Sequence, residues 1–159
     1  MGRTKQTACA AVAALLILAG CATSPEDESR RQNMEADIDE ILTYELDKTE
    51  FGEPKNCLST NEYRSFRALG NRHLLFEGRR DKLWVNVLRG RCPGLRDDST
   101  FIMRQNVGGR TCDKDRFEVI EQAGSSISGS IAGATCMLGE FKPVAKAQVE
   151  EIETRLEMR

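Results

Sequence analysis

The sequence contains a single histidine, His73, and no Cys-x-x-Cys pair. A zinc finger and a thioredoxin-type redox motif therefore both lack their usual spacing. A Cys₄ metal site assembled from distant cysteines remains an alternative, but we expect no metal and no cofactor. The clustered serines lack the Gly-x-Ser-x-Gly frame of a hydrolase nucleophile. These serines are Ser125, Ser126, Ser128 and Ser130.

Long apolar runs are also scarce. The longest extends from Ala8 to Ala19 and follows a short basic segment that contains Arg3 and Lys5. Twelve helical residues would span about 18 Å, whereas the hydrocarbon core of a bilayer is ~30 Å thick. We therefore expect no permanent membrane-spanning helix. The order of basic, apolar and small residues is that of a secretory signal peptide over residues 1–20.

Four residues at the end of this segment, Leu18-Ala19-Gly20-Cys21, resemble the lipobox of bacterial lipoproteins. In that family the cysteine thiol receives a diacylglycerol, the signal peptide is cut off before the cysteine, and the new amino group is acylated, for example with palmitate. The resemblance implies that Cys21 is lipidated and anchors the protein to a membrane. Two or more acyl chains anchor stably, because each buried methylene contributes ~0.8 kcal/mol.

The residue after Cys21 indicates whether a lipoprotein stays in the inner membrane or moves to the outer membrane. Lipoproteins retained in the inner membrane often carry Asp there, and this chain has Ala22. By that family rule we expect the outer membrane, with the domain facing the periplasm. The alternative is a plainly secreted protein in which Cys21 has no role.

Charge is distributed unevenly along the chain. Removal of residues 1–20 takes two of the 23 basic residues and leaves 21 against 25 acids, a net charge near −4. Residues 25–53 hold eleven acids against three basic residues, whereas residues 64–96 hold nine basic residues against two acids. The two segments are complementary. A negative net charge in an envelope protein also argues against a nucleic-acid partner.

Four cysteines remain when Cys21 is set aside, namely Cys57, Cys92, Cys112 and Cys136. An even number in an exported chain predicts two disulfides. Of the three possible pairings we favour Cys92 with Cys112, and Cys57 with Cys136. On the chain-entropy account, loops of these lengths stabilise a fold by roughly 3 to 5 kcal/mol each.

Two helices and a tether flank the cysteine-rich region. Residues 21–33 lack apolar content, so we expect a flexible tether. In residues 34–52, apolar residues at helical spacing predict an acidic amphipathic helix from about Met34 to Lys48, which Gly52 and Pro54 end. Residues 144–159 predict a second helix, whose face would more often pack on its own domain than on a partner. That face consists of Ala145, Val149, Ile152 and Leu156.

In residues 57–143 the apolar residues alternate with a period of two, and Gly, Pro and Asn occupy the expected turns. We predict a mainly β domain, a small antiparallel sheet or barrel braced by the two disulfides and flanked by an N-terminal and a C-terminal amphipathic helix. Residues 83–88 predict a central strand with alternating faces, and the Gly/Ser-rich residues 123–134 predict a mobile loop. The expected strands are Tyr63–Ala68, His73–Glu77, Leu83–Leu88, Thr100–Gln105, Arg110–Cys112, Phe117–Glu121 and Thr135–Leu138.

Arginines gather after the expected central strand. Arg89, Arg91 and Arg96 lie beside a cysteine and a turn, where they could form an anion site or a partner-binding face. They could instead be solvated charges that discourage edge pairing. In a third alternative, the acidic N-terminal helix covers this face within the same molecule.

Several pieces of residues 57–143 resemble a family of small proteobacterial exported proteins that carries only a domain-of-unknown-function label. The most specific pieces are the Asn-containing strand before Cys-Pro-Gly-Leu and the ending Cys-x-Leu-Gly-x-Phe-x-Pro. The resemblance implies one compact domain with four cysteines and transfers no catalytic residue. Both helices lie outside it. The pieces are Cys57-Leu58, residues 83–88, Arg91–Leu95, Thr111-Cys112 and Cys136–Pro143.

As function we expect a lipid-anchored, non-catalytic binding or scaffolding module of the cell envelope, with a possible envelope protein as partner. The alternative is a carrier of a small ligand or lipid, which would need an apolar cavity in the β-domain. A hydrolase is the third reading, and it would need His73 or Glu140 in a cleft beside a second polar group.

Overall fold

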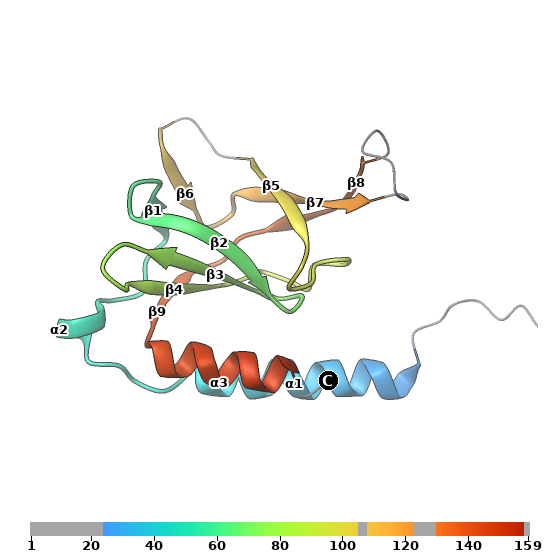
Figure 1. Ribbon diagram of the computed structural model, residues 1–159, viewed down its shortest axis with the longest axis horizontal. Coiled ribbons are helices and arrows are strands. Elements are labelled where there is room, and N and C mark those ends of the chain that lie inside the picture. The colour runs from blue at the N-terminus through green and yellow to red at the C-terminus, as the bar shows by residue number, and fades with distance from the viewer. Residues whose placement is uncertain (1–23, 105–107, 123–129, 158–159) are drawn as a thin grey trace, which may run out of the picture.

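The computed structural model describes residues 24–104, 108–122 and 130–157. These residues form three antiparallel sheets with helices at both ends (Figure 1). The prediction of a mainly β protein with antiparallel sheets, two disulfides and terminal helices is confirmed. The helices are α1 (Pro25–Ile41), α2 (Lys48–Phe51) and α3 (Lys146–Glu157). The strands are β1 (Cys57–Ser59), β2 (Tyr63–Leu69), β3 (His73–Gly78), β4 (Leu83–Val87), β5 (Thr100–Arg104), β6 (Arg110–Cys112), β7 (Arg116–Gln122), β8 (Ser130–Met137) and β9 (Phe141–Val144).

The layers of the molecule follow from the largest sheet. Its strand order is β2-β3-β4-β9, and the other two sheets are β5-β7-β8 and β1-β6. Helices α1 and α3 lie side by side on one face of the four-stranded sheet, and the remaining strands lie beyond the other face (Figure 1). The result is a sheet covered on both sides, as a sheet with two apolar faces requires.

Strand β4 shows why both faces are covered. It pairs with β3 on one side and β9 on the other, so the predicted central position is confirmed. Leu83, Val85 and Val87 belong to the core on the helix side, whereas Trp84 and Leu88 belong to the core between the sheets. Successive side chains of a strand point to opposite faces, and here both faces are apolar.

The core between the sheets is aromatic. Its centre is Phe76, fully buried on β3, whose ring contacts Phe66 at 5.6 Å and Phe141 at 5.1 Å between centroids. Phe101 and Phe117 extend the cluster onto the β5-β7-β8 sheet, with their centroids 5.3 Å apart. Aromatic pairs at such distances add to the stabilisation from burial.

The core under the helices is aliphatic. Ile38 and Ile41 of α1 and Val149, Ile152 and Leu156 of α3 are buried against the sheet. The apolar face of the C-terminal helix is therefore used by its own domain, as expected. This packing holds the N-terminal helix to the rest of the fold at its C-terminal half.

Helix α1 begins nine residues earlier than predicted, so residues 25–33 are helical rather than a tether. The Ser24 hydroxyl accepts a hydrogen bond from the Asp27 backbone N–H, and Pro25 occupies the first turn. Ser at the cap, Pro at the first position and acids in the first turn all favour a helix start. The tether was predicted from low apolar content, which does not reveal these capping signals.

The same helix also ends earlier than predicted, at Ile41, with Leu42 as its C-cap. A separate short helix, α2, follows after a turn, because the Asp47 carboxylate accepts hydrogen bonds from the backbone N–H and the hydroxyl of Thr49. The prediction that one helix continues to about Lys48 was therefore wrong. Gly52 does stop α2, as its C-cap with a φ of 88°.

All four predicted cysteines form disulfides, but the favoured pairing was wrong. The bonds are Cys57–Cys112 and Cys92–Cys136. Cys57 and Cys112 lie directly opposite each other where β1 pairs with β6. The short strand β1 had not been predicted, so this register could not enter the choice. With all four thiols bonded, a Cys₄ metal site is excluded in this structure.

Only part of the Gly/Ser-rich segment lies within the described residues. Residues 130–134, predicted to lie in a mobile loop, belong to β8, which pairs with β7. Residues 123–129 lie outside the described residues. Strand β9 was also missed, because four residues that include Pro143 give no clear alternation. Pro143 is tolerated there because β9 is the edge of its sheet.

Candidate functional site

The acids of α1 meet the basic residues of the sheet. Arg91 forms ion pairs with Glu28 and with Glu35, the latter at 2.8 Å between Nε and Oε2. Glu35 is buried at 6% exposure, whereas Glu28 is near the surface. A hydrogen bond from Gln32 and the contact with Arg91 lower the pKa of Glu28. Arg91 therefore links two turns of the helix to the loop after β4.

A second set of contacts lies beside the first. Asp39 forms an ion pair with Arg72 at 3.4 Å and accepts a hydrogen bond from His73 Nε2 at 3.2 Å. His73 is 1% exposed, and burial lowers its pKa although Asp39 opposes the shift. The Arg72 guanidinium also reaches Glu35 at 4.0 Å. These contacts join the acidic residues of α1 to the basic residues of positions 64–96.

The three predicted arginines do not form one site. Arg91 faces α1, Arg89 pairs with Asp113 at 3.0 Å, and Arg96 lies 3.9 Å from Asp98. The alternative in which the acidic helix covers the basic face within the molecule is therefore correct for Arg91. Arg96 is left exposed, at 77% of its side chain.

His73 and Glu140 do not meet in a cleft. The His73 ring is buried under α1 and donates a hydrogen bond to Asp39, and Glu140 is exposed in the loop before β9. A general base must reach a substrate proton, and this imidazole faces the helix. The contact between His73 and Asp39 therefore joins the helix to the sheet.

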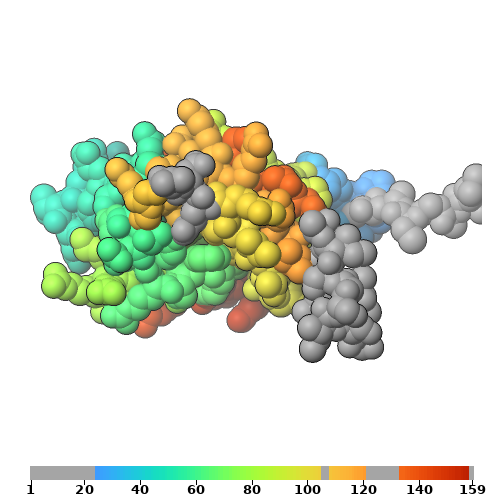
Figure 2. All heavy atoms as spheres, turned by 90° about the horizontal axis from the view of Figure 1, so that it is seen from above, coloured from blue at the N-terminus to red at the C-terminus, as the bar shows by residue number. Residues whose placement is uncertain are grey.

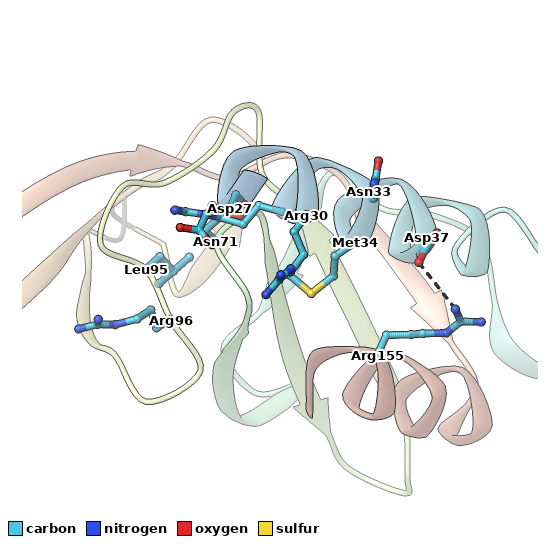
Figure 3. Close-up of a pocket in the computed structure, with 10 residues that line it drawn as sticks. Asp27, Arg30, Asn33, Met34, Asp37, Asn71, Leu95, Arg96 and Arg155 are labelled. Carbon is cyan, nitrogen blue, oxygen red and sulfur yellow. Dashed lines mark hydrogen bonds and ion pairs between the residues drawn. The ribbon is translucent and has the colours of Figure 1, made fainter. Parts of the chain in front are cut away.

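A groove lies between the N-terminal half of α1 and the loop after β4. One hollow of about 510 Å³ and an adjoining one of about 640 Å³ share Arg31, Asn71, Leu95 and Arg96 in their walls. Figure 3 shows Leu95 and Arg96 on the loop and Arg30 and Met34 on α1, on opposite sides of the first hollow. We call these two hollows together the α1 groove.

The α1 groove combines cations with an apolar floor. Leu95 is buried at 2% exposure and Met34 is half-buried, whereas Arg30, Arg31 and Arg96 are exposed. At the far end of the first hollow, Arg155 of α3 pairs with Asp37 at 3.6 Å (Figure 3). Such a surface suits a ligand with an anionic and an apolar part.

Arg30 and Arg31 were missed as candidates because the sequence reasoning placed them in a tether. The helix start at Ser24-Pro25 was the signal that could have found them. A helix over these residues puts their side chains on a fixed surface. Seen from above, the helix extends past the edge of the sheets (Figure 2).

Cys21 and the signal segment lie outside the described residues. Among residues 24–104, 108–122 and 130–157, no helix is long and apolar enough to cross a membrane. The same residues contain no group of three or more His, Cys, Asp or Glu side chains placed to hold a metal ion.

Comparison with known proteins identifies a family but no function. Residues 4–157 match a family described as a family of unknown function (DUF6491). The match includes both terminal helices, which the resemblance seen in the sequence had placed outside residues 57–143. No curated protein and no solved structure matches the chain. The chain therefore belongs, over nearly its whole length, to the DUF6491 family of unknown function.

Proposed function

We propose that this protein is a lipid-anchored, non-catalytic binding module of the cell envelope, held by Cys21 in the outer membrane and facing the periplasm. The observation that carries the proposal is the use of the cysteines. Cys57 pairs with Cys112 and Cys92 with Cys136, which leaves Cys21 without a disulfide partner among residues 21–159. Disulfides of this kind favour an oxidising compartment. Neither disulfide needs Cys21, which directly follows the signal segment and is the residue we propose to be acylated.

Binding at the surface is favoured over the two other readings. The space between the sheets is filled by Phe76, Phe117 and Phe141, each fully buried, which favours a packed core over a carrier cavity. The polar groups that could do chemistry, such as His73 and Asp39, are engaged in helix–sheet contacts. The α1 groove, in contrast, presents side chains to solvent.

The anchor is tested by replacing Cys21 with Ser in cells that express the full chain. We expect Cys21→Ser to move the protein from salt-washed membranes to the soluble fraction and to abolish palmitate incorporation. Cys9→Ser is the matched control, since it removes another cysteine of the N-terminal segment, and it should leave both properties unchanged. Membrane association of Cys21→Ser that persists after a high-salt wash would contradict the anchor.

The choice of membrane is tested by a change at the next position. Ala22→Asp should shift the protein from outer-membrane to inner-membrane fractions, if the lipoprotein sorting rule applies to this chain. The total amount and the acylation should not change. An unchanged distribution of Ala22→Asp would remove the argument for the outer membrane without affecting the anchor.

A further inference from the structure

The charges of the α1 groove are not balanced within the described part of the chain. The first hollow is lined by four arginines and two aspartates. One arginine, Arg155, is neutralised by Asp37. The remaining arginines, Arg30, Arg31 and Arg96, face Asp27 in the first hollow and Asp98 in the second. The groove thus keeps a positive excess, although the chain as a whole is negative.

The three arginines are also free to bind. Within residues 24–104, 108–122 and 130–157, Arg30 and Arg31 make no ion pair, and Arg31 Nε donates only a long hydrogen bond, 3.4 Å, to the Asp27 carbonyl. Arg96 and Asp98 are 3.9 Å apart, with side chains 77% and 88% exposed. An ion pair so exposed contributes little. The arginines of the helix–sheet interface, such as Arg91, are in contrast occupied.

The covalent chain limits how far the groove can be from the proposed anchor. Cys21 and Pro25 are four residues apart, which allows at most about 14 Å. Arg30 and Arg31 lie five and six residues into α1, which adds about 9 Å along the helix axis. An acyl group on Cys21 would therefore keep the groove within roughly 25 Å of the lipid surface.

We propose that the α1 groove binds the phosphate headgroup of an anionic membrane lipid. Arg30, Arg31 and Arg96 hold the phosphate oxygens, because guanidinium groups form paired, charge-assisted hydrogen bonds with phosphate. Met34 and Leu95 contact the apolar part of the lipid. The proposal rests on the proposed function, since the anchor at Cys21 places the groove near the membrane.

The test uses unacylated protein, so that it does not depend on the anchor. Residues 21–159 carrying Cys21→Ser are exported and purified, and their flotation with vesicles is measured. The vesicles contain equal parts of phosphatidylglycerol and phosphatidylethanolamine, or phosphatidylcholine alone. We expect binding to the anionic vesicles only, with an affinity that falls as salt is added.

Two charge-matched triple variants locate the site. Arg30→Gln, Arg31→Gln and Arg96→Gln together should weaken vesicle binding on the order of tenfold to a hundredfold. The control removes three exposed basic residues from the β3–β4 turn and should bind as before. A larger loss of vesicle binding in the Arg30, Arg31 and Arg96 variant than in the control supports the groove. An equal loss of binding in both variants overturns it. The control consists of Arg79→Gln, Arg80→Gln and Lys82→Gln.

Soluble glycerol phosphate separates a lipid headgroup from a free phosphate compound. If the groove binds lipid, glycerol phosphate competes with anionic vesicles, and the triple arginine variant loses both ligands. Binding of glycerol phosphate without vesicle binding would overturn the lipid assignment. Release of Cys21→Ser from cell membranes tests the anchor separately, so failure of the groove and failure of the anchor are distinguishable. Because all three arginines are exposed, the variants should keep the wild-type denaturation midpoint.

Discussion

Asn86 and Gly139 bind each other through two hydrogen bonds. The Asn86 side-chain N–H donates to the Gly139 carbonyl at 2.7 Å, and the Gly139 backbone N–H donates to Asn86 Oδ1 at 2.9 Å. Asn86 is fully buried in the middle of β4. Its amide replaces a backbone partner for the turn between β8 and β9. The two most specific pieces of the sequence resemblance, the Asn-containing strand and the Leu-Gly ending, thus contact each other.

Replacing Asn86 with Ala would leave the Gly139 N–H and carbonyl without these partners. Each buried unsatisfied group costs about 1 to 3 kcal/mol, so Asn86→Ala should lower the free energy of unfolding by roughly 2 to 6 kcal/mol. Urea denaturation followed by circular dichroism measures the loss. The exposed Asn61 provides the control, since Asn61→Ala should change stability by less than about 0.5 kcal/mol. Equal effects of the two changes would refute a role for the buried amide pair.

Gly139 is required because the chain passes very close to β4. A Cβ placed on Gly139 would lie 2.0 Å from the Val87 carbonyl oxygen, and backbone cannot give way as a flexible side chain can. Gly139→Ala should therefore destabilise the fold by about 3 kcal/mol or more. Gly90→Ala is the matched control, because nothing lies within 4 Å of its added Cβ. Similar melting temperatures for both variants would contradict this close approach.

The two disulfides should differ in their contribution. Their separations of 55 and 44 residues predict nearly equal loop-entropy effects, about 4 kcal/mol each. Cys92 and Cys136 are buried, however, whereas Cys57 and Cys112 are only half-buried. Replacing the buried pair with Ser places two hydroxyls in the core, so that double variant should be the less stable.

Denaturant unfolding of the two double Cys→Ser variants would measure this difference. Peptide mapping of unreduced protein checks the pairing itself and should recover Cys57 with Cys112. Recovery of Cys57 with Cys136 instead would contradict the register in which β1 pairs with β6.

Arg91 should matter more for stability than Arg89, although both are partly exposed arginines of one loop. Arg91→Ala removes the 2.8 Å partner of the buried Glu35 carboxylate and leaves it only the longer 4.0 Å contact with Arg72, which is costly for a buried charge. Arg89→Ala removes only a more exposed pair with Asp113. The denaturation midpoint should fall further for Arg91→Ala. Adding Glu35→Gln to Arg91→Ala should restore part of the loss, and no recovery in this double variant would argue against the pair.

His73 should make the fold sensitive to mild acid. Burial lowers its pKa in the native state, whereas the unfolded chain keeps a value near 6.5. The unfolded state therefore binds more protons in this range, and stability is full above about pH 6.5 and is lost as the pH falls toward the native pKa. The groups facing the ring are Asp39, Glu35 and Arg72.

The His73 contribution is isolated by comparison with His73→Gln. Carboxylates with a lowered pKa, such as Glu28 and Glu62, also lose stability on acidification, so the wild type alone is not sufficient. Denaturation midpoints measured from neutral to mildly acidic pH should decline more steeply for the wild type. Parallel curves for the two proteins would show that His73 does not titrate on unfolding.

Much of the β-domain could be read from the sequence because its strands alternate clearly. Leu83 to Leu88 lie on the faces that the alternation predicts, since a strand between two cores must be apolar on both. Ser24 and Pro25 also indicate the start of α1, but the predicted start at Met34 was based on apolar spacing and not on these capping residues. Short strands such as β1 and β9 lack enough residues to show any period.

The candidate site was less predictable. Opposite charge on residues 25–53 and 64–96 indicated that the two segments could meet, and Arg91 with Glu35 shows that they do. Which arginines stay free depends on the direction of each side chain after folding. Arg96 and Arg30 come from distant segments, and no local pattern relates them.

By itself the sequence determined the fold class, the strand that lies in the centre of the main sheet, and the four cysteines that form disulfides. Periodicity and residue type decide these features locally. Only the tertiary structure decided the pairing of Cys57 with Cys112, the bonds between Asn86 and Gly139, and the groove between α1 and the loop that carries Arg96. Each of these depends on strand register or helix placement, which are set by packing between residues far apart in the chain.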